Sequence, residues 1–122
     1  MGLAGRRVLI VEDEAMISAL IEIIVGDAGC SIVGPVATSE QALELIEREP
    51  LDAALLDVRV NDHDVYAVAD ALSGREIPFI FVSGFARKQL PPRYRHCAYI
   101  AKPFSPDMIL TRLNEAVAGK GL

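Results

Sequence analysis

Carboxylates follow two apolar stretches of the sequence, at points where strands would end. Glu12, Asp13 and Glu14 come directly after RRVLIV, and Asp57 closes the stretch DAALLD. Two carboxylates about 5 Å apart repel each other by roughly 3 kcal/mol at an effective dielectric constant near 20. If these acids meet in the folded chain, they therefore need a positively charged partner.

Lys102 is a candidate for that partner. It ends the apolar stretch CAYIA and is followed by Pro103. Because a lysine side chain is strongly hydrated and resists burial unless it is paired, we expect its ammonium group to reach Asp57. A cis peptide bond between Lys102 and Pro103 would aim the side chain inward, as cis prolines do in tight connections.

One lysine cannot balance the charges of Glu12, Asp13 and Asp57. A hard divalent cation can, and Mg²⁺ fits best, since it keeps several waters and accepts one or two carboxylates together with a phosphate. A carboxylate can attack phosphorus to form an acyl phosphate, while a metal ion and a lysine stabilise the charge on the equatorial oxygens. These residues therefore indicate Mg²⁺-dependent phosphoryl chemistry.

The elements that must position these residues follow from the apolar pattern. Short apolar stretches alternate with amphipathic ones, which is typical of an α/β protein. Joined by right-handed crossovers, the strands form an open, doubly wound parallel sheet, which binds ligands beyond the carboxyl ends of its strands. That edge would gather the acids with Ser83, Gly84 and Lys102. The expected strands cover residues 6–11, 30–37, 52–57, 78–83 and 97–101.

Helical periodicity and capping residues place helices between the strands. Residues 38–41 match the capping box S/T-x-x-Q and open one helix, Asp64 is the expected cap of the next, and Ser105 with Pro106 opens the last. The segment before the fifth strand differs, because Pro91 and Pro92 forbid a long helix there. We expect a short helical turn at most in place of the fourth helix.

The composition narrows the class of protein. A chain of 122 residues with 52% hydrophobic and 24% charged residues is typical of one packed domain, and its apolar stretches are too short to span a bilayer. The net charge of −5 argues against direct nucleic-acid binding. Because the N-terminus lacks a signal peptide's apolar stretch, we expect a cytoplasmic protein with no membrane contact, in which Cys30 and Cys97 are reduced packing residues.

The motifs VLIVEDE, LLD, FVSG and AKPF, in this order, resemble the receiver domain of bacterial two-component response regulators over essentially the whole chain. The resemblance implies a flavodoxin-like sheet of strand order 2-1-3-4-5 and one receiver domain over residues 1–122. It also implies a signalling protein that is no enzyme beyond its own phosphorylation and autodephosphorylation. The chain is either complete or a piece of a longer regulator or hybrid kinase.

The resemblance assigns a role to each residue of the candidate site. Asp57 would be the phosphoacceptor, and a histidine kinase or phosphotransfer protein would be the donor. Mg²⁺ would bind Glu12, Asp13, Asp57 and the backbone carbonyl of Arg59. Lys102 would pair with the phosphoryl group.

The resemblance also implies a switch. Ser83 would bond a phosphoryl oxygen and move inward, and Tyr99 would follow into the vacated space. This movement would change the surface built from the fourth and fifth strands and their helices, where an unknown downstream protein would bind. Tyr99 also fits the simpler reading of a half-buried strand aromatic.

Two features depart from the common receiver pattern. The loop VRVNDHD after Asp57 lacks the usual proline and glycine, which leaves open whether Arg59 reaches the phosphate or obstructs water. The motif FVSGFA, with the proline-broken basic segment after it, resembles a subgroup marked by a Phe-Ala-Thr-Gly type motif, often stand-alone in alphaproteobacteria. Ser83 and Val82 replace the threonine and alanine of that motif.

Other interpretations stay open beside this one. A degenerate receiver would never take phosphate and would act as a fixed interaction module. An aspartyl-phosphate hydrolase of the haloacid dehalogenase type shares the chemistry, but Arg59 stands where its DxD motif has the second acid. His63 and His96 lack a partnering ligand spacing and are assigned no role. The basic cluster from Arg87 to Arg95 is either a solvated loop or a partner contact.

Overall fold

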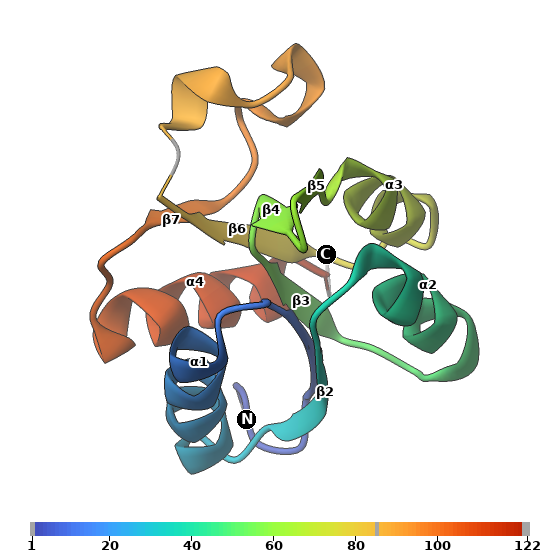
Figure 1. The fold of residues 1–122 in the computed structure, drawn as a ribbon. Coiled ribbons are helices and arrows are strands. Elements are labelled where there is room, and N and C mark those ends of the chain that lie inside the picture. The colour runs from blue at the N-terminus through green and yellow to red at the C-terminus, as the bar shows by residue number, and fades with distance from the viewer. Residues whose placement is uncertain (1, 85, 121–122) are drawn as a thin grey trace.

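The sheet of the computed structural model has five parallel strands in the order β2-β1-β3-β6-β7 (Figure 1). The model describes residues 2–84 and 86–120. Counted within this sheet, the order is the expected 2-1-3-4-5, and the flavodoxin-like prediction is confirmed. The strands are β1 (Arg7–Val11), β2 (Ser31–Val36), β3 (Ala53–Leu56), β6 (Phe79–Ser83) and β7 (Tyr99–Ala101).

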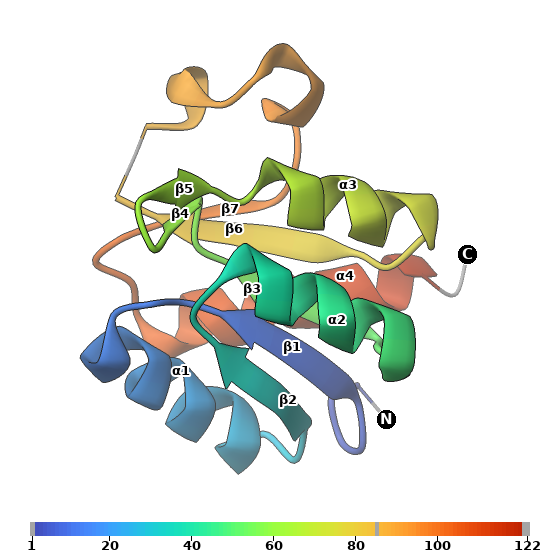
Figure 2. The same ribbon diagram turned by 45° about the vertical axis from the view of Figure 1, so that its right-hand side comes forward.

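Helices cover both faces of the sheet, so the central strands have no polar face. Leu9 and Val11 of β1 point into the core under α2 and α3, whereas Val8 and Ile10 point into the core against α1 and α4. This alternation has the period of two that a strand requires. Figure 2 shows the two layers on either side of the sheet. The helices are α1 (Ala15–Asp27), α2 (Ser39–Arg48), α3 (Tyr66–Gly74) and α4 (Pro106–Lys120).

Local hydrogen bonds explain where two helices begin. At α2, Thr38 accepts a hydrogen bond from the backbone N–H of Gln41 at 3.2 Å, and the Gln41 side chain in turn accepts from Ala37. The expected cap of α3 is wrong by one residue, because Val65 holds the N-cap position. Asp64 still accepts a hydrogen bond from the N–H of Tyr66 at 3.3 Å, so its carboxylate serves the first turn from one position further out.

A short hairpin fills the connection between β3 and α3. Its strands are β4 (Arg59–Val60) and β5 (His63–Asp64), paired antiparallel. Asn61 and Asp62 form the turn with φ angles of 53° and 63°, a left-handed conformation that asparagine and aspartate tolerate better than most residues. His63, interpreted from the sequence as a loop residue, therefore lies in an exposed strand.

In its described residues, 84 and 86–98, the segment between β6 and β7 contains no α-helix. Residues Arg87–Gln89 and Pro92–Tyr94 each form one 3₁₀ turn, as the two prolines led us to expect. Phe85 of the FVSGFA motif lies outside the described residues. Within the described chain, no helix is both long enough and apolar enough to cross a bilayer.

Candidate functional site

The ammonium group of Lys102 lies among carboxylates at the carboxyl edge of the sheet. Its Nζ is 3.0 Å from Oδ2 of Asp57, at the end of β3, and 3.0 Å from Oε1 of Glu12, at the end of β1. The peptide bond between Lys102 and Pro103 is cis. The expected contact between Lys102 and Asp57 is therefore present, and Glu12 shares the same ammonium group.

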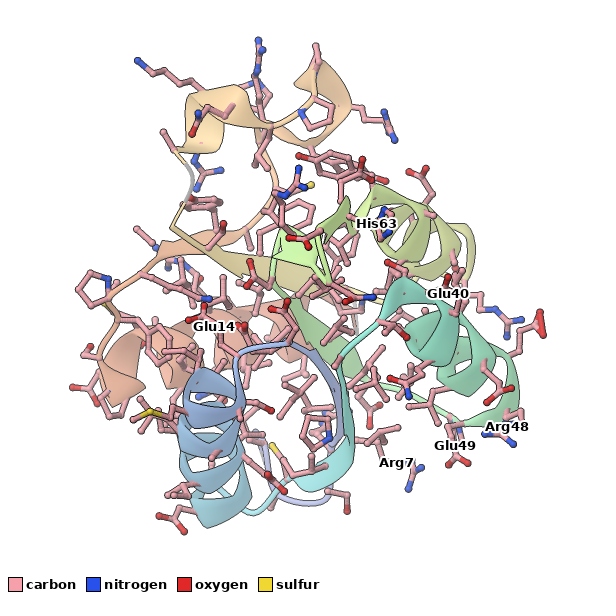
Figure 3. The ribbon with its side chains drawn as sticks, viewed as in Figure 1. Arg7, Glu14, Glu40, Arg48, Glu49 and His63 are labelled. Carbon is pink, nitrogen blue, oxygen red and sulfur yellow. The ribbon has the colours of Figure 1, made fainter. Side chains whose placement is uncertain are left out.

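Glu14 is a third carboxylate partner of Lys102. Its Oε1 lies 3.2 Å from the lysine Nζ, and its side chain is 64% exposed. Figure 3 labels Glu14 where β1 gives way to α1. The sequence placed Glu14 among the acids of this edge but assigned it no function.

Burial sets the protonation behaviour of Glu12 and Lys102. Glu12 is 4% exposed, and desolvation, with the nearby charge of Asp57, raises its pKa to about 7, although the hydrogen bond to Lys102 opposes the change. Burial lowers the pKa of Lys102, but hydrogen bonds to Glu12 and Asp57 outweigh it and raise the pKa well above its ordinary value. Lys102 therefore stays charged, and its single positive charge is too small to balance all the carboxylates around it.

The acids can hold a divalent cation. One carboxylate oxygen each of Glu12, Asp13 and Asp57 lies within 4.8 Å of the others. Glu12 Oε1 is buried and lies 3.0 Å from the Lys102 ammonium group, which leaves acceptor capacity on this oxygen unused. A buried oxygen with unused acceptor capacity beside two more carboxylates is a donor set that suits Mg²⁺.

The hairpin after β3 contacts this acidic cluster. The backbone N–H of Asn61 donates a hydrogen bond to Oδ2 of Asp13 at 2.8 Å. The guanidinium group of Arg59 binds the carbonyl oxygen of Asp62 at 2.6 Å, and its backbone N–H lies 3.4 Å from Oδ1 of Asp57. The Arg59 side chain thus folds back onto its own hairpin. Sequence reasoning missed Asn61, because a backbone N–H leaves no signal in the residue type.

A cleft of about 350 Å³ lies above Asp57. It has room for a phosphoryl group beside the carboxylate, with the ammonium group of Lys102 already in place. The residues that line it include Asp13, Asp57, Arg59, Ser83, Gly84 and Lys102.

Ser83 and Tyr99 connect this cleft to the edge strand. Ser83 ends β6 and is 2% exposed. Its carbonyl oxygen accepts a hydrogen bond from the backbone N–H of Lys102 at 2.9 Å and lies 3.4 Å from the Tyr99 hydroxyl. Burial raises the pKa of Tyr99, and the guanidinium group of Arg87 lies 5.2 Å from the centre of its ring. The Ser83 carbonyl group therefore connects Lys102 of the site with Tyr99.

A comparison with protein families explains this arrangement. The family model of the response regulator receiver domain matches residues 8–114. The chain belongs to this family. Receiver domains are signalling modules of two-component systems and are generally not enzymes. The candidate site described above therefore lies in a receiver domain.

Several bacterial proteins are similar to this chain. The transcriptional regulatory protein PdtaR of Mycobacterium tuberculosis is 32% identical over 117 residues, which cover 93% of this chain and 57% of PdtaR. The response regulator PhyR of Brucella abortus superimposes with a TM-score of 0.85 at 31% identity, over 98% of this chain and 51% of PhyR. SdrG of Sphingomonas melonis gives a TM-score of 0.79 at 33% identity, over 98% of both chains. The chain thus spans little more than half of PdtaR and nearly all of SdrG.

Proposed function

We propose that this receiver domain, acting in the cytoplasm as one domain over residues 1–122, is phosphorylated on Asp57 by a histidine kinase or phosphotransfer protein with Mg²⁺. The observation that carries the proposal is the contact between Lys102 and Asp57 at 3.0 Å in an open cleft bordered by further acids. With a cation held by the further acids, the Lys102 ammonium group would be available to an incoming dianionic group at Asp57.

The transfer follows from this geometry. A carboxylate oxygen of Asp57 forms a bond to phosphorus while the bond from phosphorus to the donor imidazole nitrogen breaks, and the imidazole keeps the electron pair. Lys102 remains protonated, and its ammonium group pairs with the phosphoryl oxygens after the transfer. When bound by Glu12, Asp13, Asp57 and the backbone carbonyl of Arg59, Mg²⁺ would neutralise the charge that builds on those oxygens.

The output would run through Ser83 and Tyr99. If the Ser83 hydroxyl turns to a phosphoryl oxygen, the end of β6 would shift together with the Ser83 carbonyl group. That carbonyl oxygen accepts hydrogen bonds from the Tyr99 hydroxyl and from the backbone N–H of Lys102. A change at Asp57 would therefore reach β7 through a single residue. The surface affected consists of β6, β7, α4 and residues 86–98, and its target would be a protein.

Phosphorylation can be tested directly. The chain and its Asp57→Ala variant are incubated with Mg²⁺ and a small phosphodonor or beryllofluoride, and compared by intact mass and by NMR. We expect one added phosphoryl group and shifted amides of Ser83 and Tyr99 in the unsubstituted chain alone. A mass and spectrum unaffected by both reagents would favour a fixed interaction module. Turnover of a phosphomonoester would favour a hydrolase.

A further inference from the structure

Basic side chains are concentrated on the segment between β6 and β7. The whole chain has 12 basic and 17 acidic residues. Figure 1 shows this segment, residues 86–98, standing out from the helical layers beyond the edge of the sheet. We call it the basic segment. Its exposed basic residues are Arg87, Lys88, Arg93 and Arg95.

Among the described residues, three of these four charges have no carboxylate partner. Arg93 pairs with Asp70 of α3 at 3.2 Å. The Arg87 guanidinium donates to the carbonyl oxygens of Arg95 and Cys97 at 3.0 and 2.5 Å, and Arg95 donates to that of Leu90. Carbonyl oxygens carry no net charge. Within residues 2–84 and 86–120, no ion pair involves Arg87, Lys88 or Arg95, so three positive charges remain uncompensated.

The basic segment is held in place although it is not helical. Leu90 is 1% exposed and Tyr94 is 5% exposed, and both belong to the core under α2 and α3. The Tyr94 ring packs edge-on against Phe81 with 5.6 Å between centroids, and its hydroxyl donates to Asp70. The backbone that carries these charges is therefore held in place, and a partner would lose little affinity to ordering it.

A groove between β7 and α4 continues this surface. Its volume is about 250 Å³. Tyr99 belongs to both parts of the surface, because it lines the groove and its ring lies under the Arg87 guanidinium. Met108 in the groove is 42% exposed, which is high for a side chain of its size and polarity. The groove is lined by Tyr99, Ile100, Ala101, Asp107, Met108, Thr111 and Arg112, so its one acid and its one arginine offset each other and the carboxylates of a partner would lie over the basic segment.

We propose that the basic segment and this groove bind an acidic segment of another protein, with carboxylates against Arg87, Lys88 and Arg95 and an apolar side chain in the groove. A protein segment fits better than a nucleic acid, because the groove beside the basic residues is lined by Tyr99, Ile100 and Met108 and suits an apolar side chain, which a sugar-phosphate backbone does not offer. The inference names the partner of the proposed output surface. Only its regulation by phosphorylation rests on the proposed function.

A synthetic peptide that alternates glutamate with leucine is a suitable probe. It is titrated into the ¹⁵N-labelled chain, beside a peptide with glutamine in place of every glutamate. We expect the acidic peptide alone to shift the amides of Arg87, Lys88, Arg95 and Tyr99. Equal binding of both peptides, or shifts elsewhere on the chain, would overturn the proposal.

Matched charge reversals locate the site. Lys88→Glu and Arg75→Glu make the same change in net charge, and Arg75 is also exposed and without an ion pair in the described residues. We expect Lys88→Glu to weaken peptide binding about fivefold, the scale of one exposed pair turned into repulsion, and Arg75→Glu to leave it nearly unchanged. Equal weakening by both would mean unspecific attraction.

Three further outcomes are decisive. Tighter binding of an oligonucleotide than of the peptide, or a self-association that Lys88→Glu abolishes, would replace the proposed partner by a nucleic acid or a second copy. If the peptide binds but beryllofluoride with Mg²⁺ changes nothing, the docking surface stands and the proposed phosphorylation fails. A response to beryllofluoride without peptide binding would leave phosphorylation standing and reject the acidic partner.

Discussion

The carboxylate of Asp13 accepts a hydrogen bond from the backbone N–H of Asn61 at 2.8 Å, so the acid after β1 is tied to the turn of the β4–β5 hairpin. One Asp13 oxygen is thereby oriented from above the cleft by a group that bears no charge. The hairpin supplies this N–H only while its turn keeps a left-handed backbone at Asn61 and Asp62.

This turn makes a stability prediction. Asn61→Ala and Asn61→Gly both remove the side chain, but the φ of 53° is strained for alanine and unstrained for glycine. We expect the alanine variant to be less stable than the glycine variant by about 1 kcal/mol. Urea unfolding of the two variants measures the difference. If alanine proved equal to glycine, the turn would not adopt this backbone in solution.

Removal of Lys102 should leave the buried acids uncompensated. Its side chain is 15% exposed, and those of Glu12 and Asp57 are 1% and 10% exposed. We expect Lys102→Met to lower the free energy of unfolding at neutral pH by about 3 kcal/mol, because Glu12 and Asp57 lose the ammonium group that lies 3.0 Å from each of them. Part of the loss should return with Mg²⁺.

Glu14→Gln is the matched control for Lys102→Met. It removes a contact to the same ammonium group, but the Glu14 side chain is 64% exposed. The expected loss is below about 1 kcal/mol. Chemical denaturation with and without Mg²⁺ measures both variants. Similar losses in the two would contradict the burial argument.

Glu12 should make stability depend on pH. Its pKa is 4.5 ordinarily and about 7 in the folded chain, so the folded state holds this proton to higher pH than the unfolded state. Without Mg²⁺, the free energy of unfolding should be higher at low pH and should fall by about 3 kcal/mol in total as the pH rises from the ordinary pKa of Glu12 to its pKa in the folded chain.

The comparison with Glu12→Gln isolates this contribution. The glutamine variant should lack the decline, since its side chain does not titrate. Urea unfolding at a series of pH values measures both proteins. Parallel profiles would show that another group is responsible.

The hydroxyl of Tyr94 should hold the basic segment against α3. It donates to Asp70, and it is the first cause of the lowered pKa of that carboxyl group, ahead of Arg93. We expect Tyr94→Phe to cost about 1 kcal/mol and to speed hydrogen exchange of the Leu90 amide. Tyr66→Phe is the control, because the Tyr66 ring stacks on Tyr94 at 6.0 Å and, within residues 2–84 and 86–120, its hydroxyl donates to no carboxylate. Equal exchange in both variants would reject the role of the hydroxyl.

Local pattern was enough to predict the parallel strands and the edge at which Asp57 and Lys102 meet, whereas the order of the strands was predicted from the family resemblance. Apolar stretches buried on both faces identify parallel strands, and the carboxyl ends of parallel strands share one edge. Asp57 and Lys102 each follow such a stretch, so their meeting could be expected. Pro91 and Pro92 likewise excluded a helix before β7 through their own geometry.

The tertiary structure decided the contacts that no local pattern encodes. Glu14 meets Lys102 across 88 residues of sequence, and Asn61 meets Asp13 across 48. Tyr94 reaches Asp70 because two 3₁₀ turns carry it back over α3. The residue type determines which hydrogen bonds and ion pairs a group can form. Which partner it meets depends on the strand order and on the paths of the loops, and these are fixed only when the whole core packs.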